Sequence, residues 1–133
     1  MSESEQHQRL VKMIIDDIVQ IVGKDQKCFI ESDAPDGRPL PQLTQEGFRP
    51  DVTFQYKDML IIGEAKTSND VDTIHSKMQY ESYIRKCSLF QGKAILIIAV
   101  PWTEYATVYN IISRIKKQYV GTYSIKYLKG IGI

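Results

Sequence analysis

The chain has 133 residues, of which 25% are charged and 43% apolar, and its formal net charge is +1 at pH 7. This length suits a single domain, predicted over residues 1–133, and the near-neutral charge excludes a global electrostatic attraction to nucleic acid. The longest apolar run, residues 94–100, is too short to span a bilayer, and the first residues do not resemble a secretory signal. A cytoplasmic protein without a membrane partner is therefore expected. Cys28 and Cys87 lack the spacing of a metal framework, which predicts free thiols.

The first predicted element is an amphipathic helix over about residues 4–22. Apolar residues recur there at helical spacing, and Gly23 stands where a helix would end. Residues 27–31 predict a short strand. Residues 33–49 hold three prolines and two glycines, which predicts an irregular loop of unusual length and suggests a functional role.

The next residues alternate in a way that predicts a β-hairpin. Val52, Phe54 and Tyr56 share one face of its first strand, and residues 59–65 continue that apolar face at every second position of the other strand. If Lys57 and Asp58 form the turn, Tyr56 pairs with Met59. An odd-length loop or a bulge would change this register.

This register places Asp51 directly opposite Glu64, with Lys66 one side-chain period further on the same face. Like charges that face each other across two strands are destabilising, so a compensating group is expected. A hard divalent cation such as Mg²⁺ is commonly held by one or two carboxylates, with water and phosphate at its other positions. The pattern therefore predicts a metal site at this end of the hairpin.

The remaining elements alternate between helix and strand. Residues 68–70 offer N-cap chemistry for a helix that extends to about Cys87, with Asp70 and Asp72 at its positive end. Residues 94–100 are apolar on both faces, which predicts a buried central strand.

Two further elements are predicted near the end of the chain. Thr103 is expected to cap a helix that follows the buried strand, and residues 123–128 predict a final strand. The predicted order, α-β-β-β-α-β-α-β, indicates an α/β fold with a mixed central sheet flanked by helices.

At this point the residues resemble a known family. Pro50-Asp51, twelve further residues and then Glu64-Ala65-Lys66 are similar to the signature of the PD-(D/E)xK nuclease superfamily. The resemblance implies that Asp51, Glu64 and the Ala65 carbonyl ligate Mg²⁺, for which Mn²⁺ would substitute, and that Lys66 assists the attacking water. It also implies a restriction-endonuclease-like αβββαβ core with an additional C-terminal helix and strand.

The second helix adds a weaker resemblance. Gln79 and Tyr83 are similar to the Gln-x-x-x-Tyr motif of the RecB-type branch, which implies that they lie near the active site and contact DNA or support the metal-site residues. His75 precedes them by one helical turn and completes a row beside the predicted core positions Ile74 and Met78. A purely structural interpretation of this row, as the polar border of the helix, stays open.

The first helix is expected to complete the metal site, because the superfamily often uses an acidic residue there. Glu3 has the helical phase of Leu10 and Ile14, whereas Glu5 points away. Glu3 is the predicted ligand if the helix already begins there, and His7 is the alternative.

Predicted nucleic-acid contacts are spread along the chain. The principal candidates are Arg38, Arg49, His75, Tyr83 and Lys86. Trp102 is predicted to be a packing residue rather than a base-stacking platform. The tyrosines of the last segment are expected to form a dimer surface or to cover the sheet edge, and they are Tyr119, Tyr123 and Tyr127.

These expectations predict a Mg²⁺-dependent DNA nuclease, more specifically an endonuclease. A bound metal activates water and neutralises charge on a phosphate, which is the chemistry that phosphodiester hydrolysis needs. Two alternatives stay open: a homodimeric nuclease of the Holliday-junction-resolving kind, and a domain that binds nucleic acid or supports an assembly without turnover.

Overall fold

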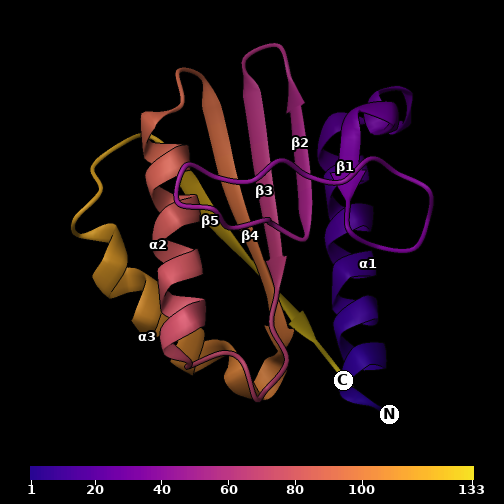
Figure 1. The fold of residues 1–133 in the computed structure, drawn as a ribbon, viewed down its shortest axis with the longest axis vertical. Helices are drawn as coiled ribbons and strands as arrows, with labels where there is room; N and C mark the ends of the chain where they lie inside the picture. Colours follow the sequence, from indigo (N-terminus) through magenta and orange to yellow (C-terminus); the bar gives the residue numbers. More distant parts are fainter.

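A mixed sheet of five strands lies between helices in the computed structural model, which describes residues 1–133 (Figure 1). The elements follow in the order α1 (Glu3–Val22), the 3-10 helix η1 (Lys24–Phe29), β1 (Ile30–Ser32), β2 (Val52–Tyr56), β3 (Met59–Ala65), α2 (Ile74–Leu89), β4 (Lys93–Pro101), the 3-10 helix η2 (Trp102–Glu104), α3 (Tyr105–Lys116) and β5 (Ser124–Gly130). The strands lie in the sheet in sequence order. The pairs β1·β2 and β2·β3 are antiparallel, and β3·β4 and β4·β5 are parallel. The predicted α/β architecture is confirmed at this level.

Helix α1 covers one face of the sheet. Its fully buried residues Leu10, Ile14 and Ile18 recur at spacings of four and pack against the apolar side of the hairpin and of β4. Gly63 in β3 allows this close approach, because a Cβ added there would lie 2.4 Å from Ile14 Cγ2. The glycine therefore sets how near the helix can come to the sheet.

Helices α2 and α3 cover the opposite face. Tyr80 and Ile84 of α2 and Val108 and Ile112 of α3 are fully buried there against the other side of the central strands. The residues 94–100 are buried throughout, as expected for a strand with a helix layer on each face.

The hairpin has the predicted register. Tyr56 pairs with Met59 and Val52 with Gly63, so the next position along places Asp51 at the level of Glu64. Lys57 adopts a left-handed backbone conformation, with φ of 56°, in the two-residue turn that closes the hairpin.

The predicted strand over residues 27–31 is wrong over its first half. Residues up to Phe29 form η1, and pairing begins only at Ile30, opposite Phe54. Ile30 is the C-cap of η1, so the chain becomes extended only from that residue on. Phe29 instead stacks on Tyr56, with ring centroids 4.1 Å apart.

Helix α2 begins later than predicted, and a different face of it is buried. Thr73 is the N-cap, and its hydroxyl accepts a hydrogen bond from the Ser76 N–H at 3.0 Å, whereas residues 68–72 form turns. Ile74 and Met78, predicted to face the core, are 79% and 53% exposed. The predicted Thr103 cap is also wrong, because η2 intervenes and α3 begins at Tyr105.

The irregular loop between β1 and β2 is confirmed, and it crosses the sheet to reach α2 (Figure 1). The Ser82 hydroxyl lies 2.7 Å from Thr44 Oγ1 and donates to Glu46 Oε1 at 2.6 Å. Arg85 also pairs with the Glu46 carboxylate at 2.5 Å. These polar contacts attach the loop to the helix.

The carboxyl ends of β3 and β4 lie at the same edge of the sheet, at the bottom of Figure 1, together with the amino ends of α1 and α2. The residues of the candidate site come from these ends. None of the helices combines the length and the apolar character needed to cross a membrane.

Candidate active site

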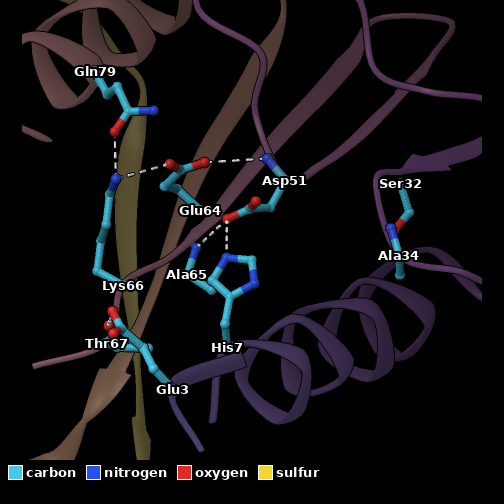
Figure 2. Close-up of polar contacts among 10 residues, drawn as sticks. All are labelled: Glu3, His7, Ser32, Ala34, Asp51, Glu64, Ala65, Lys66, Thr67 and Gln79. Carbon is cyan, nitrogen blue, oxygen red and sulfur yellow. Dashed lines mark hydrogen bonds and ion pairs between the residues drawn. The ribbon is translucent and has the colours of Figure 1, made fainter. Parts of the chain in front are cut away.

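The two predicted metal ligands lie side by side at the open end of the hairpin. The Asp51 N–H donates to Glu64 Oε1 at 3.1 Å, and the Ala65 N–H donates to Asp51 Oδ2 at 2.8 Å (Figure 2). Each carboxylate is thus held by the backbone of the opposite strand. Strand pairing alone therefore fixes their relative position.

Lys66 and Gln79 complete the buried part of this cluster. Lys66 Nζ lies 3.3 Å from Glu64 Oε2 and donates a hydrogen bond to Gln79 Oε1 (Figure 2). Glu64 is 3% exposed, Lys66 7% and Gln79 9%. The charges are therefore largely removed from water. In such buried surroundings a charge without a partner would be costly.

The pKa of the Glu64 carboxyl lies well above its usual range. Burial is the largest cause, the negative charge of Asp51 adds to it, and Lys66 opposes both. A further positive charge beside this carboxyl would stabilise its ionised form.

Tyr83 lies beneath this cluster and does not reach the surface. Its side chain is fully buried and its hydroxyl has no hydrogen-bond partner. Burial first, and then the negative charges of Glu64 and Asp51, raise the pKa of this hydroxyl. The predicted contact between Tyr83 and nucleic acid is therefore wrong, because the ring is enclosed by the core.

Helix α1 contributes His7 rather than Glu3 to the carboxylates. His7 Nε2 lies 3.3 Å from Asp51 Oδ2, and this hydrogen bond is the main cause that raises the pKa of His7. Glu3 instead accepts a hydrogen bond from the Thr67 hydroxyl at 2.7 Å (Figure 2). The helix begins at Glu3, as the first alternative required, but the structure does not bring that carboxylate to the other two.

The predicted cationic contacts do not converge on the carboxylates. Arg38 pairs with Asp36 within the loop, and Arg49 donates to the Pro41 carbonyl. His75 is exposed, with its ring edge-on to Phe48. Lys86 lines a cavity of about 540 Å³ near the turn of the hairpin, at the opposite end from Asp51.

One acidic residue beside the site was missed. Asp33, directly after β1, lines a cavity of about 210 Å³ together with His7 and Asp51. Its N–H also donates to the Asp51 carbonyl at 3.0 Å. The signal was present in the sequence, because a strand that ends just before Asp33 and pairs with β2 must end close to Asp51.

The donors present suit a hard divalent cation. Asp51, Glu64 and the Ala65 carbonyl offer oxygen atoms, and the structure groups no three His, Cys, Asp or Glu side chains at ligand distance. Mg²⁺ is commonly held by one or two carboxylates, and its other coordination positions are filled by water or by substrate oxygen atoms. The residues therefore fit such a cation.

No protein-family model matches this chain, and neither a curated protein nor a solved structure matches it. The resemblance to the PD-(D/E)xK superfamily therefore stays a prediction that depends on Asp51, Glu64, Ala65 and Lys66.

Proposed function

We propose that this protein is a divalent-metal-dependent DNA nuclease, more specifically an endonuclease, built on a restriction-endonuclease-like variant of the mixed α/β sheet. The observation that carries the proposal is the pairing of Asp51 with Glu64 across the hairpin, with Lys66 buried 3.3 Å from Glu64. Two facing carboxylates have no evident value for folding, because like charges at such positions destabilise the sheet. A divalent cation bound between the two carboxylates would offset their repulsion.

In this proposal Asp51, Glu64 and the Ala65 carbonyl hold Mg²⁺ or Mn²⁺. When bound, the cation would neutralise charge on the scissile phosphate and lower the pKa of a water molecule. The backbone hydrogen bonds to both carboxylates keep their oxygen atoms in place without further reorganisation. Two further hydrogen bonds lie at the same edge of the sheet. His7 contacts the Asp51 carboxylate, and Thr67 donates to the Glu3 carboxylate.

Lys66 is assigned to the attacking water and to the charge that develops on the phosphate. Its ammonium is held from two sides, by Glu64 and by Gln79, so it is oriented before substrate arrives. Gln79 is thus a positioning residue that acts through Lys66.

The test compares purified variants in cleavage of supercoiled plasmid DNA with Mg²⁺ or Mn²⁺. Asp51→Asn, Glu64→Gln and Lys66→Met should each lower the rate by at least about 100-fold, because each removes a ligand or a preorganised charge. Asp16→Asn is the matched control, since Asp16 is an exposed acid on α1 that pairs with Lys12. Retention of the wild-type rate by Glu64→Gln would overturn the proposal.

The same preparation separates the two alternatives. Paired, symmetric cuts in a four-way DNA junction would identify a homodimeric junction-resolving nuclease. A protein that binds DNA but cuts no substrate with either cation, and whose melting temperature neither cation raises, would be the non-catalytic domain.

A further inference from the structure

Positive charge is concentrated in the last quarter of the chain. Residues 102–133 contain five basic residues and one acidic residue, Glu104, whereas the first 101 residues contain 12 basic and 15 acidic residues. The basic residues are Arg114, Lys116, Lys117, Lys126 and Lys129. Lys126 forms an ion pair with Asp17 of α1 at 2.8 Å, so the unpaired positive charge of this region lies on the other four residues.

The same region begins with a row of aromatic rings, here called the aromatic strip: Trp102, Tyr105, Tyr109 and Tyr127. Tyr105 and Tyr109 are about one turn apart and share one side of α3, and Trp102 lies three residues before Tyr105, in η2. Trp102 is 59% and Tyr109 47% exposed. The predicted packing role of Trp102 is therefore wrong, because most of its ring faces solvent.

The half-buried Tyr105 and Tyr127 pack against each other and against the exposed Tyr109. The ring centroid of Tyr127, from β5, lies 5.4 Å from that of Tyr105 and 5.7 Å from that of Tyr109. Lys129 Nζ lies 4.2 Å from the centroid of Tyr105, which places a cation directly at the rings. The strip thus combines fixed apolar ring faces with positive charge.

The strip starts at the edge of the sheet that carries the candidate active site. Trp102 directly follows β4, and the Ala99 carbonyl near the end of that strand accepts a hydrogen bond from the Lys66 N–H at 3.0 Å. In Figure 1 the lower ends of β3 and β4 lie together where η2 and α3 begin. A ligand on the strip would therefore extend toward Lys66.

We propose that the aromatic strip binds a single-stranded segment of nucleic acid, whose unpaired bases stack on Trp102 and Tyr109. Ring faces combined with nearby cations are the chemistry that recognises unpaired bases and their phosphates, whereas a duplex keeps its base faces covered. The cationic surroundings distinguish this ligand from an apolar peptide. That the bound strand leads to Asp51 and Glu64 rests on the proposed nuclease function, but the binding itself does not.

Trp102 supplies a direct readout, since it is the only tryptophan of the chain. The probe is a 20-nucleotide oligothymidylate, added to the full chain in EDTA so that no cleavage occurs. Stacking on Trp102 should quench its fluorescence, and a blunt duplex of equal length should quench it much less. Unchanged fluorescence at saturating oligothymidylate would overturn the proposal.

Variants measure the contribution of each ring by fluorescence anisotropy of a labelled oligothymidylate. Trp102→Ala and Tyr109→Ala should each weaken binding roughly 5- to 150-fold, whereas Trp102→Phe keeps a stacking ring and should lose less. Phe29→Ala is the control, because Phe29 is 40% exposed and lies near the hairpin turn, away from the strip. Equal losses in the control and in Trp102→Ala would overturn the proposal.

Salt dependence tests the charged part of the surface. Lys129→Gln should reduce the slope of log affinity against log salt concentration by about 0.7, the value for one phosphate contact on a single strand. An unchanged slope together with unchanged affinity would exclude Lys129 from the surface and count against the proposal.

Failure of the strip and failure of the nuclease have different signatures. Binding that depends on the strip, without any cleavage, supports the strip and rejects the nuclease. Cleavage that depends on Glu64, with full affinity in the Trp102→Ala/Tyr109→Ala variant, supports the nuclease and rejects the strip. Concentration-dependent dimers in sedimentation that this double variant abolishes, without oligothymidylate binding, would identify the strip as a contact between two copies and also reject the proposal.

Discussion

Helices α1 and α2 cover opposite faces of one sheet with different chemistry. The buried face of α1 is aliphatic, with Leu10, Ile14 and Ile18 fully enclosed. The buried face of α2 includes Gln79 and Ser82, and this helix leaves larger apolar side chains in solvent. One helix therefore serves mainly to exclude water from the sheet, and the other places polar groups beside it.

The difference shows what a buried polar face requires. An enclosed amide or hydroxyl lowers stability unless it is hydrogen-bonded. The Tyr83 hydroxyl of α2 has no partner, whereas Gln79 and Ser82 have partners from other elements. Gln79 accepts from Lys66 of the hairpin end, and Ser82 contacts the loop before β2. Helix α2 is thus specified by particular partners, whereas α1 depends on apolar area and fit.

The largest expected effect is on stability, at the centre of the α1 face. Ile14→Ala should lower the free energy of unfolding by about 2–5 kcal/mol, because it leaves a cavity in a fully enclosed site. Urea denaturation measures this loss, and the cleavage rate per folded molecule should stay near that of the wild type. A large loss of rate at full folding would show that α1 also serves the chemistry directly.

The close approach of α1 to β3 predicts a second effect. Gly63→Ala should cost about 1–3 kcal/mol by overpacking, since its new Cβ would meet Ile14 Cγ2. In the Ile14→Ala background that clash is removed, so the same substitution should cost much less in a double-mutant cycle of unfolding free energies. Strictly additive losses would contradict the proposed contact.

On α2 the expected effect moves from stability to rate. Gln79→Met should lower cleavage about 10- to 100-fold, because Lys66 loses the amide that holds its ammonium. Met78→Gln changes the adjacent, exposed position and is the matched control. If the two variants cleave equally fast, Gln79 has only a structural role.

A smaller loss of stability is expected where the loop meets α2. Ser82→Ala should cost about 1–2 kcal/mol, because it removes a buried hydroxyl and leaves Thr44 without that partner. Urea denaturation at pH 7 measures the loss, and exposed Ser68→Ala is the control. A loss as small as that of the control would show that this contact does not anchor the loop.

The smallest expected effect is a dependence of that loss on pH. The hydrogen bond from Ser82, followed by contacts with Arg85, lowers the pKa of the Glu46 carboxyl. A carboxyl with a lowered pKa in the folded state contributes stability above its unfolded pKa and loses it as the pH falls through the folded pKa. The wild type should therefore exceed Ser82→Ala by less at pH 3 than at pH 7. A difference that grows on acidification would contradict this assignment.

The sequence was most informative where side-chain pattern and packing agree. The aliphatic spacing of α1 and the alternation of the hairpin each correspond to a buried face, so the helix limits and the pairing of Tyr56 with Met59 are confirmed. Once that pairing is set, Asp51 and Glu64 must meet. The part of the candidate site that lies on the hairpin was therefore predictable.

The spacing of apolar residues was misleading on α2, where the buried side includes polar residues. Ile74 and Met78 had the spacing of a core stripe, but the buried side of α2 carries Tyr80 and Ile84. Gln79 and Ser82 are buried beside them, and their hydrogen-bond partners come from distant segments. No local feature of the sequence predicts the hydrogen bond between Thr44 and Ser82, which are 38 positions apart. The exposure of Trp102 was missed for a related reason, because its place after a buried strand suggested packing rather than a surface role.

The hairpin also determines when the carboxylates meet during folding. Asp51 and Glu64 are 13 positions apart, so closing one short turn brings them together. The Lys66 N–H donates to the Ala99 carbonyl, 33 positions further along the chain, so this contact requires the later pairing of β3 with β4. In the early hairpin both carboxylates are hydrated, and two charges 4 Å apart repel by only about 1 kcal/mol in water. The repulsion becomes costly only when α2 excludes that water.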